Sequence, residues 1–145
     1  MKKRGFTLIE LLIVIAVIAI LIGIALPRFK GMQQEGNIAK AKAELRTLKT
    51  AVESYYIHNN NTYPAALTSL TTANPQIVET LPTDSFNSNA NYGYALSGNG
   101  SYFVVNSVGA GGNGSAASAN TGVVTETNGS SCIYGTNGTP LDTQP

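Results

Sequence analysis

The chain has almost none of the residues that build catalytic or metal centres. Its 145 residues include one cysteine, one histidine and no tryptophan. A single cysteine, Cys132, excludes an intramolecular disulfide, so the staple of many small secreted domains is absent. A nucleophile and its base would have to be built from Cys132 and His58, and a metal site would need more ligands than these. We therefore predict that the protein is not an enzyme and holds no catalytic residues, metal or cofactor.

Positive charge is absent from the part of the chain that follows Lys49. All nine Lys and Arg residues lie at or before that position. The charged residues beyond it are all acidic: Glu53, Glu79, Asp84, Glu126 and Asp142. Nucleic-acid binding depends largely on cations that neutralise phosphates, and such a surface offers none. We predict no nucleic-acid partner.

A long apolar run at the N-terminus is the most informative segment that the sequence does contain. The basic residues 2–4 lead through Gly5 into a nearly unbroken apolar run over residues 6–26. About 20 apolar residues suffice to span a bilayer, and preceding basic residues favour a cytoplasmic N-terminus. Glu10 interrupts the run, and a carboxylate within a membrane is costly unless it has a partner. A plain membrane anchor would leave Glu10 unexplained.

A conventional secretory signal is an alternative interpretation of this segment. Gly23 and Ala25 are small residues placed where a signal peptidase would cleave. In this alternative, cleavage after Ala25 would release a secreted enzyme. Two features argue against it. Glu10 would lie inside the apolar region of the signal, and the run is longer than the roughly 7 to 15 residues that are usual there.

The residues around Gly5 carry a family resemblance. Gly5 followed by Phe6, with Glu10 four positions further on, resembles the processing site of type IV prepilins and of the related pseudopilins of type II secretion systems. The resemblance implies that a prepilin peptidase cleaves between Gly5 and Phe6 and methylates the new amine. Residues 1–5 would then be a leader peptide. Since Glu10 lies about one helical turn from that amine, we expect it to pair with the amine of its own or a neighbouring chain and to set helix register during assembly.

The segment after the apolar run has the periodicity of an amphipathic helix. Six apolar residues recur at steps of three and four, namely Ile38, Ala41, Leu45, Leu48, Val52 and Tyr55. Joined to the apolar run, this pattern predicts one long helix over residues 6–58. Its first half lacks a polar face and should be buried in lipid or in copies of itself, whereas its second half should pack under a head.

Two residues are expected to interrupt that helix. Pro27 removes a backbone hydrogen bond and clashes with the preceding turn, so we expect a kink or a locally melted stretch between Gly23 and Pro27. Gly23 makes local melting easier because glycine disfavours the helix interior. The family resemblance adds that this segment is often unwound in assembled filaments.

Residues 59–145 are rich in Asn, Gly, Ser and Thr, a composition that predicts a small β-rich head. Residues 63–70 look like a loop that leads into one or two short helical turns. The strongest strand candidates are residues 92–96 and 102–107, joined as a hairpin through residues 97–100. Weaker candidates are residues 123–127 and 132–134. A long helix packed on such a sheet predicts an α+β fold with a small C-terminal antiparallel sheet.

The order of motifs in the head resembles the major pseudopilin of type II secretion systems. Tyr63-Pro64, Leu81-Pro82-Thr83-Asp84, Tyr92-Gly93-Tyr94 and the glycine-rich residues 107–112 follow one another as in that family. One departure is clear. The family's last loop usually carries aspartates that bind calcium, whereas residues 109–120 contain none. Calcium prefers six to eight oxygen ligands with carboxylates among them, so no calcium site is expected.

Together these features predict a structural subunit, a pilin or pseudopilin, that polymerises through its N-terminal helix. Its expected partners are copies of itself, the prepilin peptidase and an inner-membrane assembly platform. It would cross the inner membrane once before assembly and lie in a periplasmic or extracellular filament afterwards. The sequence leaves open whether that filament is a surface pilus or a secretion pseudopilus. An alternative is a membrane-tethered extracytoplasmic binding module that does not polymerise.

Overall fold

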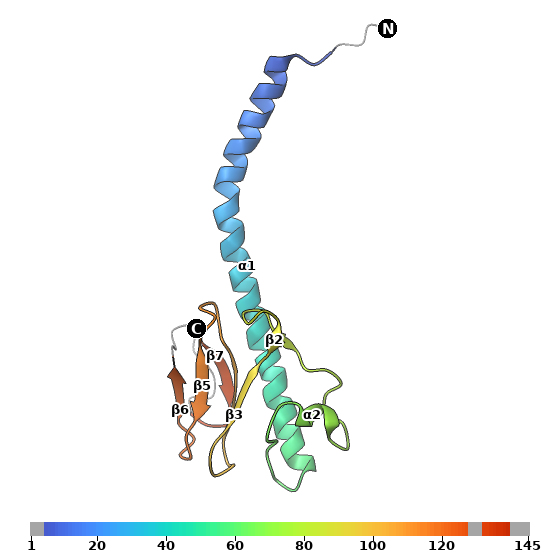
Figure 1. Ribbon diagram of the computed structural model, residues 1–145, viewed down its shortest axis with the longest axis vertical. Helices are drawn as coiled ribbons and strands as arrows, with labels where there is room; N and C mark the ends of the chain where they lie inside the picture. Colours follow the sequence, from blue (N-terminus) through green and yellow to red (C-terminus); the bar gives the residue numbers. More distant parts are fainter. Residues whose placement is uncertain (1–4, 128–131, 140–145) are drawn as a thin grey trace. The chain divides into compact units, whose positions relative to one another are not determined.

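The structure is a computed structural model that describes residues 5–127 and 132–139. One long helix precedes a set of short strands, and a short helix lies between them (Figure 1). The helices are α1 (Leu8–His58) and α2 (Ser69–Thr72), and the strands are β1 (Thr83–Asp84), β2 (Ala90–Asn91), β3 (Gly93–Leu96), β4 (Phe103–Ser107), β5 (Ser115–Ser118), β6 (Val124–Thr127) and β7 (Ile133–Thr136). This arrangement confirms the predicted α+β class with small antiparallel sheets.

The chain forms two compact units, residues 1–36 and 37–145, and α1 contributes to both. In the first unit the apolar part of α1 is long and apolar enough to cross a membrane, judged by length and composition. The second unit combines the C-terminal part of α1 with all the strands. Residues 1–4 of the predicted leader lie outside the described residues.

The C-terminal part of α1 buries one stripe of side chains. The buried residues are Ala41, Leu45, Leu48, Ala51 and Val52, and Ile38 and Tyr55 pack half-buried against the same core. Their steps of three and four place them on one face of the helix, which confirms the predicted stripe and adds Ala51 to it. The helix ends at His58. Asn60 and Asn61 follow with φ angles of 51° and 55°, a conformation that asparagine adopts more readily than most residues.

The centre of the second unit is a three-stranded antiparallel sheet in the order β3-β4-β7. Val105 of β4 pairs with Tyr94 on one side and with Gly135 on the other. Every residue of β4 is buried, because both faces of the strand are covered. Phe103 and Val105 join the core beneath α1, whereas Val104 joins a second core with Ala116, Cys132 and Tyr134.

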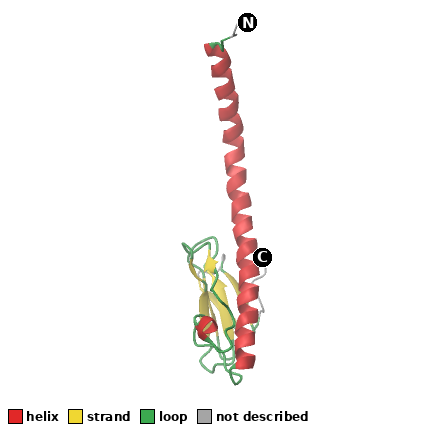
Figure 2. Cartoon of the chain, turned by 90° about the vertical axis from the view of Figure 1, so that its right-hand side faces the viewer, coloured by secondary structure: helices red, strands yellow, loops and turns green. Residues whose placement is uncertain are grey.

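Three layers therefore make up the second unit. The C-terminal part of α1 covers one face of the central sheet, as Figures 1 and 2 show. The antiparallel pair β5-β6 covers the other face through Ala116 and Val124. A further short antiparallel pair, β1-β2, precedes β3 in the chain.

The predicted strands are confirmed, with additions. β3 and β4 form the expected hairpin, and its turn uses Gly100 with a φ of 69°, in the region that favours glycine. β6 and β7 form where strands were expected, but β7 pairs with β4 and β6 pairs with β5. β5 was not expected, because Ser-Ala-Ala-Ser has little intrinsic strand preference. The short helix α2 begins near the end of the segment in which helical turns were predicted.

Candidate functional site

The predicted processing site precedes the first turn of α1. Gly5 and Phe6 are both exposed, and the Phe6 side chain is 80% exposed. A Cβ atom built on Gly5 would meet nothing within 4 Å. The fold of this chain therefore leaves room for a larger side chain at position 5.

Glu10 and Thr7 close the N-terminal end of α1 as a capping box. The backbone N–H and the hydroxyl of Thr7 both donate to Oε2 of Glu10, at 2.9 and 2.7 Å. In return the backbone N–H of Glu10 donates to Oγ1 of Thr7 at 3.3 Å. These reciprocal bonds satisfy backbone donors that the first turn of a helix otherwise leaves without partners.

The capping box leaves one oxygen of Glu10 available. Oε2 accepts both bonds from Thr7, and Oε1 accepts no hydrogen bond from any of the residues that the structure describes. The carboxylate is thus held by its own chain on an exposed side chain, and Oε1 is not used by the cap. A cation on another chain could bind that oxygen without disturbing the cap.

Sequence reasoning missed Thr7. The signal was present, since a threonine followed three residues later by a glutamate, at the start of an apolar run, is the signature of a capping box. The carboxylate in the apolar run therefore has a structural partner within the single chain. Its expected pairing with the amine of Phe6 stays a prediction, because Gly5 still precedes Phe6 in this structure.

α1 is helical through both residues that were expected to interrupt it. Gly23 and Pro27 lie within the continuous helix, so the single chain shows no melted stretch there. Pro27 lacks the N–H that would reach the carbonyl of Gly23 four residues earlier, and the loss of one bond does not end a long helix. A Cβ atom at Gly23 would meet nothing within 4 Å. Unwinding of this segment in a filament stays a prediction.

The apolar part of α1 exposes large side chains on all its faces. They are Leu8, Ile9, Leu11, Leu12, Ile13, Val14, Ile15, Val17, Ile18, Ile20, Leu21, Ile22, Ile24 and Leu26. A helix that is apolar all round is ordinarily buried in a membrane or in a large assembly. Water is a poor environment for a surface of this extent, which calls for lipid or other protein chains to cover it.

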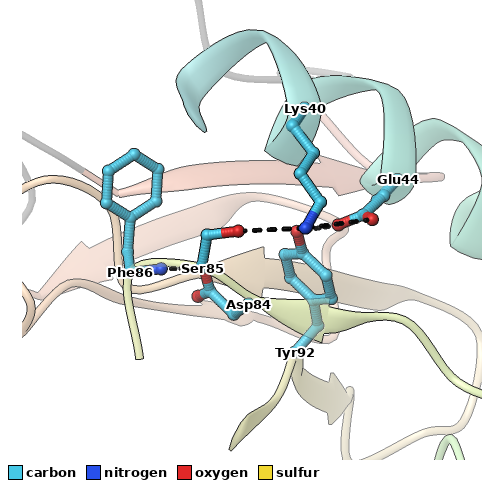
Figure 3. Close-up of polar contacts among 6 residues, drawn as sticks. All are labelled: Lys40, Glu44, Asp84, Ser85, Phe86 and Tyr92. Carbon is cyan, nitrogen blue, oxygen red and sulfur yellow. Dashed lines mark hydrogen bonds and ion pairs between the residues drawn. The ribbon is translucent and has the colours of Figure 1, made fainter. Parts of the chain in front are cut away.

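A group of polar contacts joins α1 to Ser85, which follows β1, and to Tyr92, which precedes β3, within the second unit (Figure 3). The hydroxyl of Tyr92 donates to Oε2 of Glu44 at 2.6 Å, and Lys40 Nζ donates to Oγ of Ser85 at 3.1 Å. Lys40 and Glu44 also form an ion pair at 3.8 Å along the helix. Burial, and then the hydrogen bond to Glu44, raise the pKa of Tyr92 above its usual range. The phenol therefore stays a neutral donor at physiological pH.

Asp84 is a fully buried carboxylate that holds two loops together. Its Oδ1 accepts the backbone N–H of Phe86 at 2.9 Å, and its Oδ2 accepts that of Val108 at 3.0 Å. Val108 begins the glycine-rich loop after β4. Both carboxylate oxygens are thus used for backbone donors, which is how a buried charge is tolerated without a cation.

The residues considered for catalysis occupy structural positions. Nδ1 of His58 lies 2.8 Å from the carbonyl of Ser54 at the exposed end of α1. Cys132 is buried, its thiol donates to the carbonyl of Ser107, and burial raises the pKa of the thiol to about 11. A thiol in such a state is a poor nucleophile. Across the part of the chain that the structure describes, no three His, Cys, Asp or Glu residues come together as metal ligands.

Comparison with known families covers most of the chain. Residues 1–26 match the family described as the prokaryotic N-terminal methylation motif. Residues 28–126 match the family described as type II secretion system protein G. No solved structure matches the chain.

Similar curated proteins are pilins and secretion pseudopilins. The chain is 51% identical over 57 residues to the fimbrial protein EcpB of Eikenella corrodens, which is 39% of this chain and 36% of that protein. It is 47% identical over 55 residues to the type IV major pilin protein PilA of Myxococcus xanthus (strain DK1622), 38% of this chain and 25% of that protein. It is 31% identical over 64 residues to the type II secretion system core protein G of Pectobacterium carotovorum subsp. carotovorum, 44% of this chain and 40% of that protein. Each match spans less than half of the relative.

Proposed function

Since this chain belongs to the family of type II secretion system protein G, we propose that it is a structural subunit that polymerises through its N-terminal helix into a pilus-like filament. The observation that carries the proposal is the exposed apolar surface of α1 together with the oxygen of Glu10 that the cap does not use. The apolar surface must be covered by lipid or by other helices. The Glu10 carboxylate offers each chain one fixed anionic contact.

Before assembly the chain crosses the inner membrane once, with its N-terminus in the cytoplasm. The match to the methylation motif supports cleavage after Gly5 by a prepilin peptidase and methylation of Phe6. An inner-membrane assembly platform then passes the helix into the growing filament. The working division of the chain is a leader at 1–5, a long helix at 6–58 and a head at 59–145.

In the filament the amine of Phe6 pairs with Glu10 of its own or a neighbouring chain. The capping box supports this step because Thr7 holds the Glu10 carboxylate in one position and leaves Oε1 for a second partner. A fixed charge pair among apolar side chains defines how far one helix slides past the next. Gly23 and Pro27 supply the segment that unwinds during packing.

The head favours a secretion pseudopilus over a surface pilus. The match to protein G extends over residues 28–126 and so includes the strands from β1 to β5 and most of β6. The matches to the fimbrial protein EcpB and to the major pilins PilA and PilE1 cover 39%, 38% and 50% of this chain. An N-terminal helix of this kind is expected of both classes of filament.

The test compares processing and assembly in the same cells. Glu10→Val should leave membrane insertion and cleavage intact, because it removes a charge from an apolar run, yet it should sharply reduce the yield of sheared filaments. Mass spectrometry of the N-terminus reports cleavage and methylation of Phe6. Quantification of sheared filaments reports assembly.

Two further variants complete the design. Glu35→Val changes the same residue type on the same helix outside the apolar run, and its filament yield should stay normal. Gly5→Leu should accumulate at full precursor mass in the membrane. Abundant filaments from Glu10→Val would remove the proposed role of Glu10, and normal mature protein from Gly5→Leu would remove the prepilin interpretation.

A further inference from the structure

A groove on the first unit combines an apolar lining with one cation. It has a volume of about 260 Å³ and is lined by Leu21, Ile24, Ala25, Arg28, Phe29 and Met32. These residues follow one face of α1 at steps of one, three and four, and the four largest apolar side chains among them are all more than half exposed. Arg28 is the only charged residue in the lining.

The length of the apolar helix sets the depth of Arg28 in a bilayer. At a rise of about 1.5 Å per residue, Arg28 lies about 30 Å along the helix from Leu8, which matches the thickness of the hydrocarbon core of a typical bilayer, also about 30 Å. With the N-terminal end at the cytoplasmic boundary, Arg28 lies at the level of the outer headgroups.

Arg28 binds no anionic side chain among the residues that the structure describes. It forms no ion pair or hydrogen bond with the residues that the structure describes. The next carboxylate along the chain, Glu35, lies about two helical turns further on, which is too far for an ion pair within one helix. A guanidinium binds phosphate through two parallel hydrogen bonds, which an ammonium group cannot match.

We propose that this face of α1 binds an anionic phospholipid of the outer leaflet while the chain waits in the membrane. The lipid phosphate pairs with Arg28, and one acyl chain lies in the groove against Leu21, Ile24 and Ala25. A net anionic headgroup is preferred because a zwitterionic headgroup carries its own ammonium group, which competes for the phosphate. The inference rests on the membrane stage proposed above.

Lys30 provides a matched control within the same helix. It lies at a similar depth but two residues further on, which turns it about 200° around the helix axis and away from the groove. Removal of either residue lowers the net charge by one unit. Only removal of Arg28 should abolish the proposed phospholipid site.

The experiment uses the full chain in detergent, mixed with equal amounts of phosphatidylglycerol and phosphatidylcholine of the same acyl chains. Native mass spectrometry should show one bound lipid, with phosphatidylglycerol favoured about fivefold, the factor expected when one cation contributes roughly 1 kcal/mol near anionic lipid. Arg28→Gln should bring the two lipids close to equal binding. Lys30→Gln should keep the preference, and Arg28→Lys should fall between, since it keeps the charge but loses the paired geometry.

Two results would overturn the lipid site: equal binding of both lipids by the unchanged chain, or the same loss of preference in Arg28→Gln and Lys30→Gln. Flotation with vesicles of phosphatidylcholine alone tests the membrane stage independently of the lipid site. The unchanged chain and Arg28→Gln should both float. A chain that stays with the soluble fraction would contradict the membrane stage and the lipid site together.

Discussion

At the scale of single residues, Glu10 uses one carboxylate oxygen to cap its own helix, and the proposed assembly contact would use the other. Oε2 accepts from the backbone and hydroxyl of Thr7, and the Glu10 side chain is exposed. A flexible glutamate would lose rotamer freedom on binding a second chain, whereas a carboxylate that Thr7 already holds loses little. Thr7 thus positions the group on which the proposed assembly contact depends.

Replacement of Thr7 tests this arrangement. Thr7→Val keeps the shape of the side chain but removes the hydroxyl that both donates to Glu10 and accepts from its backbone N–H. Amide exchange at Glu10 in the full chain in detergent should become about fivefold faster, in line with the loss of a helix cap. Thr7→Ser retains the hydroxyl and should exchange like the unchanged chain. Equal exchange in all three proteins would show that the cap does not stabilise the first turn.

At the scale of secondary-structure elements, the head is joined by contacts between segments far apart in the chain. Asp84 in β1 accepts a backbone donor from Val108, and Tyr92 binds Glu44 of α1. Aromatic rings also join the helix to the sheet. The ring centroid of Tyr63 lies 4.4 Å from that of Tyr56 in α1 and 5.0 Å from that of Phe103 in β4. These contacts hold the strands to the helix, and no disulfide joins the described residues.

Asp84→Asn should destabilise the head. An amide offers one acceptor oxygen where the carboxylate offers two, so the N–H of either Phe86 or Val108 loses its partner. We expect a loss of about 1 to 3 kcal/mol, seen as a lower thermal midpoint in the near-UV circular dichroism of the full chain in detergent. Glu79→Gln makes the same chemical change at an exposed carboxylate and should leave the midpoint unchanged.

The same melting experiment tests whether the head needs calcium. Because both oxygens of Asp84 are used by backbone donors and residues 109–120 carry no carboxylate, excess chelator should leave the midpoint of the unchanged chain where it was. Addition of calcium should not raise it. A midpoint that rises with calcium and falls with chelator would contradict the prediction that the head holds no metal.

At the scale of the whole molecule, the surface suited to assembly and the surface suited to water lie in different parts of the sequence. Nearly all the exposed large apolar side chains precede Lys30, and Met32, Ile57 and Val123 are the ones that follow it among the described residues. The second unit buries its own apolar side chains in two cores, one on each face of the central sheet. Assembly should therefore depend on the first 30 residues.

Deletion of residues 1–30 should leave a soluble monomer. The remaining part of α1 has a polar face opposite its buried stripe, and the remaining exposed apolar side chains are scattered singly. Sedimentation equilibrium over a range of concentrations should give the mass of one fragment. Stable oligomers of the fragment would place part of the assembly surface on the head.

The sequence by itself determined the long helix, its apolar and amphipathic parts, and the family to which the chain belongs. These features are local: a 3.6-residue period, a run of apolar residues and a short motif are visible in adjacent residues. The capping box at Thr7 and Glu10 was equally local, and sequence reasoning overlooked a signal that was there. The hairpin of β3 and β4 could be predicted for the same reason, since its turn lies between adjacent strands.

Only the tertiary structure decided how the later strands pair and what Asp84 and Tyr92 do. β7 pairs with β4 across an intervening pair of strands, and the strand β5 exists because β6 and the second core hold it there. β4 is buried on both faces, so it lacks the alternation that identifies a half-buried strand. Asp84 binds Val108 and Tyr92 binds Glu44, and the residues of each pair lie far apart in the sequence. The periodicity of nearby residues therefore cannot predict these contacts. They form because Asp84 and Tyr92 are buried, so the polar groups of these two side chains must find partners within the fold.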